Sequence, residues 1–118
     1  MENLASILIV TNDEQSELVE IMFNLGYLPL IRRKMYPALN MIRHKCVDAV
    51  LLDFDQMEID ALEFIINVRD INSVIPVVIV DTSIDEKEFL LKQNHVVLIE
   101  KNVNQIKTLL KSLLRTKS

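Results

Sequence analysis

The chain has 118 residues, half of them hydrophobic and a quarter charged, and its formal net charge is −4. A chain of this composition can bury a hydrophobic core, which excludes a disordered chain. The negative net charge argues against sequence-independent binding to nucleic acid. No segment resembles a signal sequence or a membrane span, and the single cysteine, Cys46, fits a reducing compartment. We therefore expect one domain over residues 1–118, located in the cytoplasm, without nucleic-acid or membrane contacts.

Five short apolar runs predict five strands. Polar or turn-forming residues bound each run, which is typical of strands buried on both faces of a parallel sheet. Pro29 lies inside the second run and cannot donate a hydrogen bond to a neighbouring strand, so we expect that strand near an edge of the sheet. In chain order the runs are Ser6–Val10, Tyr27–Arg32, the part of Val47–Asp55 that ends at Asp53, Ile75–Val80 and His95–Ile99.

Apolar residues also recur at helical spacing between and after these runs. The first helix is expected to have Asn12 or Asp13 as its N-cap and to stop at Gly26, the single glycine. The fourth helix is expected to be short. The predicted helices are Glu14–Leu25, Tyr36–Lys45, Ala61–Ile71, Asp85–Gln93 and Val103–Leu114.

The alternation of five strands with five helices predicts a flavodoxin-like, doubly wound α/β fold with strand order 2-1-3-4-5. In such folds ligands bind outside the carboxyl ends of the strands. Polar side chains follow four of the predicted strands, so we expect them to lie along one edge of the sheet. They are Thr11, Asn12, Asp13, Asp53, Asp55, Asp81 and Lys101.

Carboxylates that are held close together repel one another and raise one another's pKa unless a cation intervenes. Lys101 can neutralise one carboxylate, and a divalent cation with oxygen ligands can neutralise others. A simpler interpretation is that Asp53 only ends a strand and forms a structural ion pair with Lys101. The residues by themselves leave both interpretations open.

The sequence resembles the receiver domain of two-component response regulators over nearly its whole length. The resemblance rests on ILIV at 7–10, LGY at 25–27, VLLD at 50–53, IPVVIV at 75–80 and Lys101. It implies a domain in phosphorelay signal transduction that acts through protein contacts and is not an enzyme. Asp53 is then the phospho-acceptor, Lys101 neutralises the phosphoryl oxygens with Mg²⁺ assisting, and the partner is a sensor histidine kinase or another signalling protein.

The sequence also departs from the pattern of that family. Thr11 and Asn12 stand where receivers carry an acidic pair, and Asp13 comes one position late. Asp81 replaces the threonine or serine that follows the phosphoryl group, and Leu98 replaces an aromatic residue on the fifth strand. A carboxylate repels a phosphoryl group. Across about 4 Å the repulsion is about 1 kcal/mol in water, and it is larger when the two groups are partly shielded from water.

These departures affect metal binding and switching more than they affect the fold. The alternative function is a pseudo-receiver, an interaction module that works without phosphorylation. The expected contact face comprises the fourth helix, the fifth strand and the fifth helix, and a homodimer through this face is also expected. The Mg²⁺ site that the resemblance implies is expected to be weak, with Asn12, Asp13, Asp53 and Asp55 as its ligands.

A third interpretation starts from the sequence DFD at 53–55, which resembles the DxD motif of haloacid-dehalogenase-type phosphatases. In those enzymes the first aspartate is the nucleophile and the second is an acid/base. The motif normally ends the first strand of the fold and is accompanied by a later acidic pair. Here it ends the third predicted strand and that pair is missing, so this function is the least favoured.

Overall fold

The computed structural model describes residues 4–81 and 96–114. One parallel sheet of five strands runs through them in the order β2-β1-β3-β4-β5, so the predicted order is confirmed. The strands are β1 Ser6–Val10, β2 Leu28–Arg32, β3 Ala49–Asp53, β4 Val77–Asp81 and β5 Val97–Glu100.

The described ranges contain four α-helices, not the five expected from the sequence. They are α1 Glu17–Asn24, α2 Met35–His44, α3 Ala61–Ile71 and α5 Val103–Leu114, and the 3₁₀ turn η1 at Phe54–Gln56 follows β3. The expected fourth helix, Asp85–Gln93, and the expected first residue of the fifth strand, His95, lie outside the described residues. No helix in the described ranges has the length and apolar character needed to cross a membrane.

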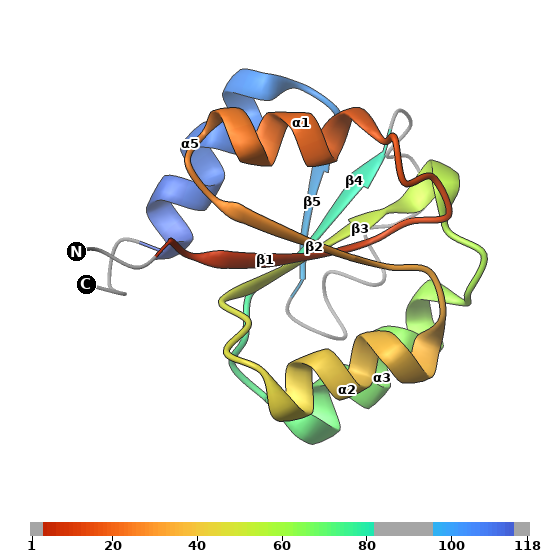
Figure 1. The fold of residues 1–118 in the computed structure, drawn as a ribbon. Helices are drawn as coiled ribbons and strands as arrows, with labels where there is room; N and C mark the ends of the chain where they lie inside the picture. The colour runs from red at the N-terminus through yellow and green to blue at the C-terminus, as the bar shows by residue number, and fades with distance from the viewer. Residues whose placement is uncertain (1–3, 82–95, 115–118) are drawn as a thin grey trace.

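Helices cover both faces of the sheet, α1 and α5 on one side and α2 and α3 on the other (Figure 1). Every residue of β3 and β4 is buried, because these strands lie between the two helical layers. Successive side chains of a strand point to opposite faces. The side chains therefore divide into two clusters, one with Leu8, Val10, Val50 and Leu52 toward α2 and α3, and one with Ile7, Ile9 and Leu51 toward α1 and α5.

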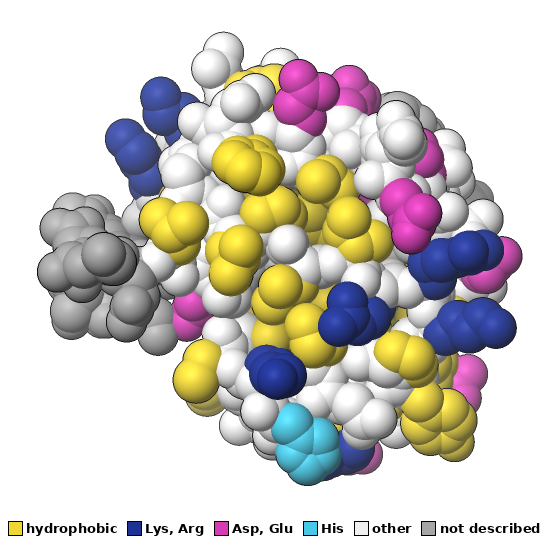
Figure 2. Space-filling view, viewed as in Figure 1, with side chains coloured by type: hydrophobic (Ala, Val, Ile, Leu, Met, Phe, Trp, Pro, Cys, Tyr) yellow, Lys and Arg dark blue, Asp and Glu magenta, His cyan; other side chains and the backbone are white. Residues whose placement is uncertain are grey.

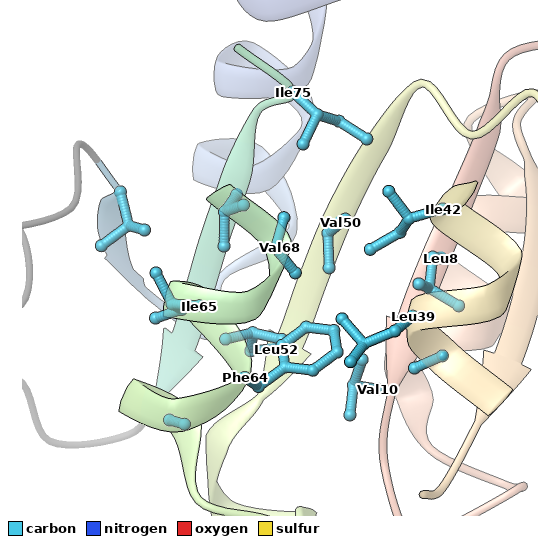
Figure 3. Packing of buried hydrophobic residues seen from close by; sticks show 14 of the residues in the cluster. Leu8, Val10, Leu39, Ile42, Val50, Leu52, Phe64, Ile65, Val68 and Ile75 are labelled. Carbon is cyan, nitrogen blue, oxygen red and sulfur yellow. The ribbon is translucent and has the colours of Figure 1, made fainter. Parts of the chain in front are cut away.

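The cluster beneath α2 and α3 is centred on Phe64. Its ring is fully buried and lies among Leu52, Leu39 and Val10 (Figure 3). The side chains in this group come from β3, α2 and β1, so Phe64 joins α3 to three other elements. This packing holds β3, and with it the position of Asp53, against the rest of the domain.

Local signals explain several helix boundaries. Gly26 has φ +90°, a left-handed conformation that residues with a Cβ rarely adopt, and it directly follows the last turn of α1. Asp60 is the N-cap of α3, and its carboxylate accepts a hydrogen bond from the Glu63 amide at 2.9 Å. Pro37 lies in the first turn of α2, where its missing N–H costs nothing.

The edge strand β2 is suited to its place by Pro29. The Leu28 amide donates to the Ala5 carbonyl at 2.8 Å, and the Arg32 carbonyl accepts from the Thr11 amide at 3.1 Å. These bonds direct the backbone groups of Leu28 and Arg32 toward β1, so those of Pro29 point away from the sheet. A proline at that position leaves no unpaired N–H, which discourages another strand from adding to the edge. The predicted edge position is confirmed.

Apolar side chains gather on the face of the molecule that shows β2, between α1 and α2 (Figure 2). Leu28 on this strand remains partly exposed, and Phe23 near the end of α1 is 71% exposed. Single exposed apolar residues are normal on protein surfaces. These exposed side chains therefore do not by themselves indicate a binding surface.

Replacing Phe64 by Ala is expected to lower the free energy of unfolding by about 3–5 kcal/mol, because it leaves a cavity where α3 meets β3. Ile66→Ala is the matched control, since Ile66 lies on the same helix and is 49% exposed. Its expected cost is below about 1 kcal/mol. Urea unfolding of both variants measures the difference, and similar costs at the two positions would contradict this description of the core.

Candidate functional site

The site is built around Asp53, the last residue of the central strand β3, whose side chain is fully buried. In the sheet, Asp53 pairs in register with Val80 of β4, and Asp81 pairs with Glu100 of β5. The carboxyl ends of these three strands therefore lie next to one another. Asp81 is the second buried carboxylate at this edge, being 2% exposed.

Lys101 directly follows β5 and points to Asp53. Its Nζ lies 3.2 Å from Asp53 Oδ1, with the lysine side chain 16% exposed and the aspartate side chain 0% exposed. We expected Asp53, Lys101 and Asp81 to lie in contact with one another. The contact of Lys101 with Asp53 is confirmed, and the part concerning Asp81 stays a prediction. Among the described residues Oδ1 accepts no hydrogen bond of good geometry, so the ammonium is the group that compensates the charge on this oxygen.

The other oxygen of Asp53, Oδ2, accepts two hydrogen bonds from hydroxyl groups. Thr11 Oγ1 donates at 2.9 Å from the end of β1, and Ser16 Oγ donates at 2.8 Å from the start of α1. Both donors are buried. Hydrogen bonds from neutral donors to an ionised acceptor are stronger than those between neutral groups, so this pair offsets part of the cost of burying the carboxylate.

Ser16 was missed by the sequence analysis, which predicted Asn12 or Asp13 as the N-cap of the first helix. That prediction is wrong. The N-cap is Ser16, whose Oγ accepts a hydrogen bond from the Leu18 amide at 3.2 Å, and the helix begins at Glu17. The available signal was a serine, a preferred N-cap residue, directly before an acidic first turn.

Asn12 and Asp13 make other contacts. The Asn12 side chain is exposed, and its Oδ1 accepts a hydrogen bond from Arg33 Nε at 2.9 Å. Asp13 Oδ1 accepts from the Gln15 amide at 2.9 Å, which closes a turn before α1. Asp55 lies on η1 and is exposed.

The donor groups around Asp53 do not suit Mg²⁺ in this arrangement. Mg²⁺ prefers carboxylate, carbonyl and water oxygens in octahedral geometry. In the described part of the chain, no three His, Cys, Asp or Glu side chains are grouped so that they could hold a metal ion. Within residues 4–81 and 96–114, the groups that contact the Asp53 carboxylate are instead two hydroxyls and an ammonium. The role of Asn12, Asp13, Asp53 and Asp55 as weak metal ligands stays a prediction.

This chain is similar to known proteins in structure but matches none of them by sequence. Scans against models of protein families and against curated proteins give no match to the sequence. Among solved structures, the receiver domain of NtrC4 from Aquifex aeolicus has a TM-score of 0.81 at 21% identity, covering 98% of this chain and 100% of that one. The receiver domain of sensor histidine kinase PA1611 from Pseudomonas aeruginosa PAO1 has a TM-score of 0.80 at 15% identity, covering 95% and 98%.

A CheY-like response regulator receiver domain from Methanospirillum hungatei JF-1 also matches, with a TM-score of 0.76 at 18% identity over 97% of this chain and 96% of that one. The fold is that of a receiver domain. At these identities the likeness establishes the receiver fold and not the chemistry of the site. The PA1611 structure has a magnesium ion coordinated in its active site cleft, which makes the donor groups around Asp53 the point to test in this chain.

Replacing Lys101 by Met is expected to lower the free energy of unfolding by about 3 kcal/mol, because it leaves a buried carboxylate without its cation. The loss stays near the low end for such pairs because two hydroxyls still bind Asp53. Urea unfolding measures it, with Lys107→Met on the exposed face of α5 as the matched control.

The double variant Lys101→Met/Asp53→Asn is expected to recover most of that loss, because it removes both charges together. If the double variant were no more stable than Lys101→Met, the ion pair would not be the reason for the loss.

Proposed function

We propose that this chain is a receiver-like signalling domain that acts through protein–protein contacts, with Asp53 at the phospho-acceptor position. The observation that carries the proposal is the ion pair between the buried Asp53 and the partly exposed Lys101 at the carboxyl edge of the sheet, with 3.2 Å between Oδ1 and Nζ. In open α/β sheets this edge is where ligands bind. The likeness to receiver domains over nearly the whole chain supports the same function.

Two forms of this function differ in whether Asp53 receives a phosphoryl group. In the phosphorelay form a sensor histidine kinase or a small phosphodonor supplies the group, and the carboxylate attacks phosphorus. That attack needs an oxygen within about 3–3.5 Å of the phosphorus and in line with the leaving group. The Asp53 side chain is fully buried and its Oδ2 already accepts two hydrogen bonds. These contacts favour the second form, an interaction module that does not depend on phosphorylation.

The proposed contact face includes β5 and α5, and the expected fourth helix of this face lies outside the described residues. The partner is a signalling protein or a second copy of this chain. Leu98 on β5 is partly buried and packs against the cluster beneath α2 and α3. A leucine held in the core supplies no large ring that could turn outward when the acceptor is modified. The proposed face therefore has one state and binds its partner constitutively, because a population shift needs two states with different contacts.

A small phosphodonor such as acetyl phosphate is expected to leave the mass of the wild-type protein unchanged over a time in which an ordinary receiver domain is fully labelled. The reason is that the Asp53 side chain is fully buried and its Oδ2 already accepts two hydrogen bonds. Mass spectrometry of wild type and Asp53→Asn in parallel makes the measurement. A gain of one phosphoryl mass in the wild type that is absent from Asp53→Asn would establish the phosphorelay form instead.

Self-association of the same two proteins, followed by sedimentation, is expected to be identical, because a constitutive face does not depend on Asp53. Lower association of Asp53→Asn, or a large gain after addition of the phosphodonor, would show that an ordinary switch operates.

The phosphatase interpretation can be tested separately. We expect no hydrolysis of a small phosphoester above the rate of an Asp53→Asn control, since the fold matches are to signalling domains. Asp53 also ends the central strand β3, not the first strand of the fold. Hydrolysis by the wild type that Asp53→Asn abolishes would contradict this expectation.

A further inference from the structure

The two hydroxyls that bind Asp53 in the described part of the chain each also accept a backbone hydrogen bond. Thr11 Oγ1 donates to Asp53 Oδ2 at 2.9 Å and accepts from the Asp13 amide at 3.1 Å. Ser16 Oγ donates to the same oxygen at 2.8 Å and accepts from the Leu18 amide at 3.2 Å. Two chains of hydrogen bonds therefore run from backbone amides through buried hydroxyls to one carboxylate oxygen. Such chains polarise their members and strengthen one another.

The carboxylate is thereby compensated on both sides. A carboxylate oxygen has two lone pairs, and both acceptor sites of Oδ2 are used by Thr11 and Ser16. Oδ1 faces the Lys101 ammonium. A divalent cation at Oδ2 would have to displace the two hydroxyls, and at Oδ1 it would lie beside a positive charge. The two hydroxyls and the ammonium thus compensate the charge of the carboxylate, which a bound cation would otherwise do.

We propose that Thr11 and Ser16 form a hydroxyl clamp that holds Asp53 without a metal ion and ties it to the start of α1. Thr11 anchors the turn after β1, and Ser16 caps the helix, so the two residues fix both ends of the segment 11–16. Both are positioning residues, because they act through Asp53. The inference deepens the proposed function, since it states what holds the residue at the acceptor position.

The first experiment measures thermal stability in the presence of a chelator. Ser16→Ala and Thr11→Val are each expected to lower Tm by roughly 5–10 °C, because each removes a buried hydrogen bond to a charged acceptor. Ser16→Thr keeps the hydroxyl and is expected to restore most of the wild-type Tm. Ser112→Ala and Thr108→Val make the same chemical changes on the exposed side of α5 and are expected to shift Tm by less than about 2 °C.

The second experiment separates the clamp from ordinary helix capping. In an Asp53→Asn background the further loss from Thr11→Val or Ser16→Ala is expected to fall to about half, because a neutral acceptor makes the weaker bond. Asp53→Asn keeps the shape of the side chain, so it also serves if a hydroxyl variant does not fold. In this variant the Asp13 and Leu18 amides are expected to lose protection from hydrogen exchange. Equal losses in both backgrounds, or unchanged protection of both amides, would overturn the clamp.

The third experiment adds millimolar magnesium chloride to the wild type, with sodium chloride of equal ionic strength as the control. We expect no difference in Tm and no specific shift of the Thr11, Ser16 and Asp53 amides in NMR spectra. A rise in Tm with shifts confined to these amides would show that a cation displaces the hydroxyls, and would overturn the inference.

The stability experiments do not depend on whether Asp53 is ever phosphorylated. Their failure would overturn the clamp and leave the proposed signalling function standing. A phosphoryl mass gained by Asp53 would overturn the phosphorylation-independent form and leave the clamp standing in the unmodified protein.

Discussion

The arrangement depends on one physical constraint, a carboxylate buried at the end of the central strand. Burying an ionised carboxylate costs several kcal/mol unless the protein supplies a counter-charge and hydrogen-bond donors. For Asp53 the counter-charge comes from Lys101 after β5, and the donors come from Thr11 after β1 and Ser16 before α1. A single buried charge therefore restrains the ends of three other elements. These contacts explain the short hydroxyl side chains at Thr11 and Ser16 and the long cationic side chain at Lys101, although secondary structure alone would tolerate many residues at these positions.

The topology of the sheet makes this convergence possible. Thr11 and Asp53 are 42 residues apart in sequence, yet they meet because β1 and β3 are neighbours in a parallel sheet and end at the same edge. The layers of α1 with α5 and of α2 with α3 cover both faces of the sheet (Figure 1), and every residue of β3 and β4 is buried between them. Exclusion of water lowers the effective dielectric constant and strengthens the ion pair and the hydroxyl bonds together. The hydrophobic core thus influences the strength of the ion pair and hydrogen bonds at Asp53, although no core side chain belongs to the site.

A shared fold does not determine a shared chemistry. The PA1611 receiver domain has the same fold and holds a magnesium ion in its cleft, whereas in this chain hydroxyls and an ammonium contact the central carboxylate. In this chain the side chains that contact Asp53 lie at the ends of β1 and β5 and at the start of α1, outside the two hydrophobic clusters, so they can change without disturbing the core. Signalling through protein contacts needs only a stable surface, so it is compatible with a site that performs no phosphoryl transfer.

The sequence by itself determined the strands and their order, and it placed Asp53 and Lys101 at the same edge of the sheet. Buried strands appear as continuous apolar runs, Pro29 restricts its strand to an edge, and parallel strands bring their carboxyl ends together. The sequence left the start of α1 open, because Asn12, Asp13 and Ser16 are all good N-cap residues within five positions of one another. Only the tertiary structure decided among them. Ser16 gains a buried carboxylate as a second partner, while Asn12 turns to Arg33, a residue beyond the next strand. These contacts join residues that are distant in sequence, so no local pattern reveals them.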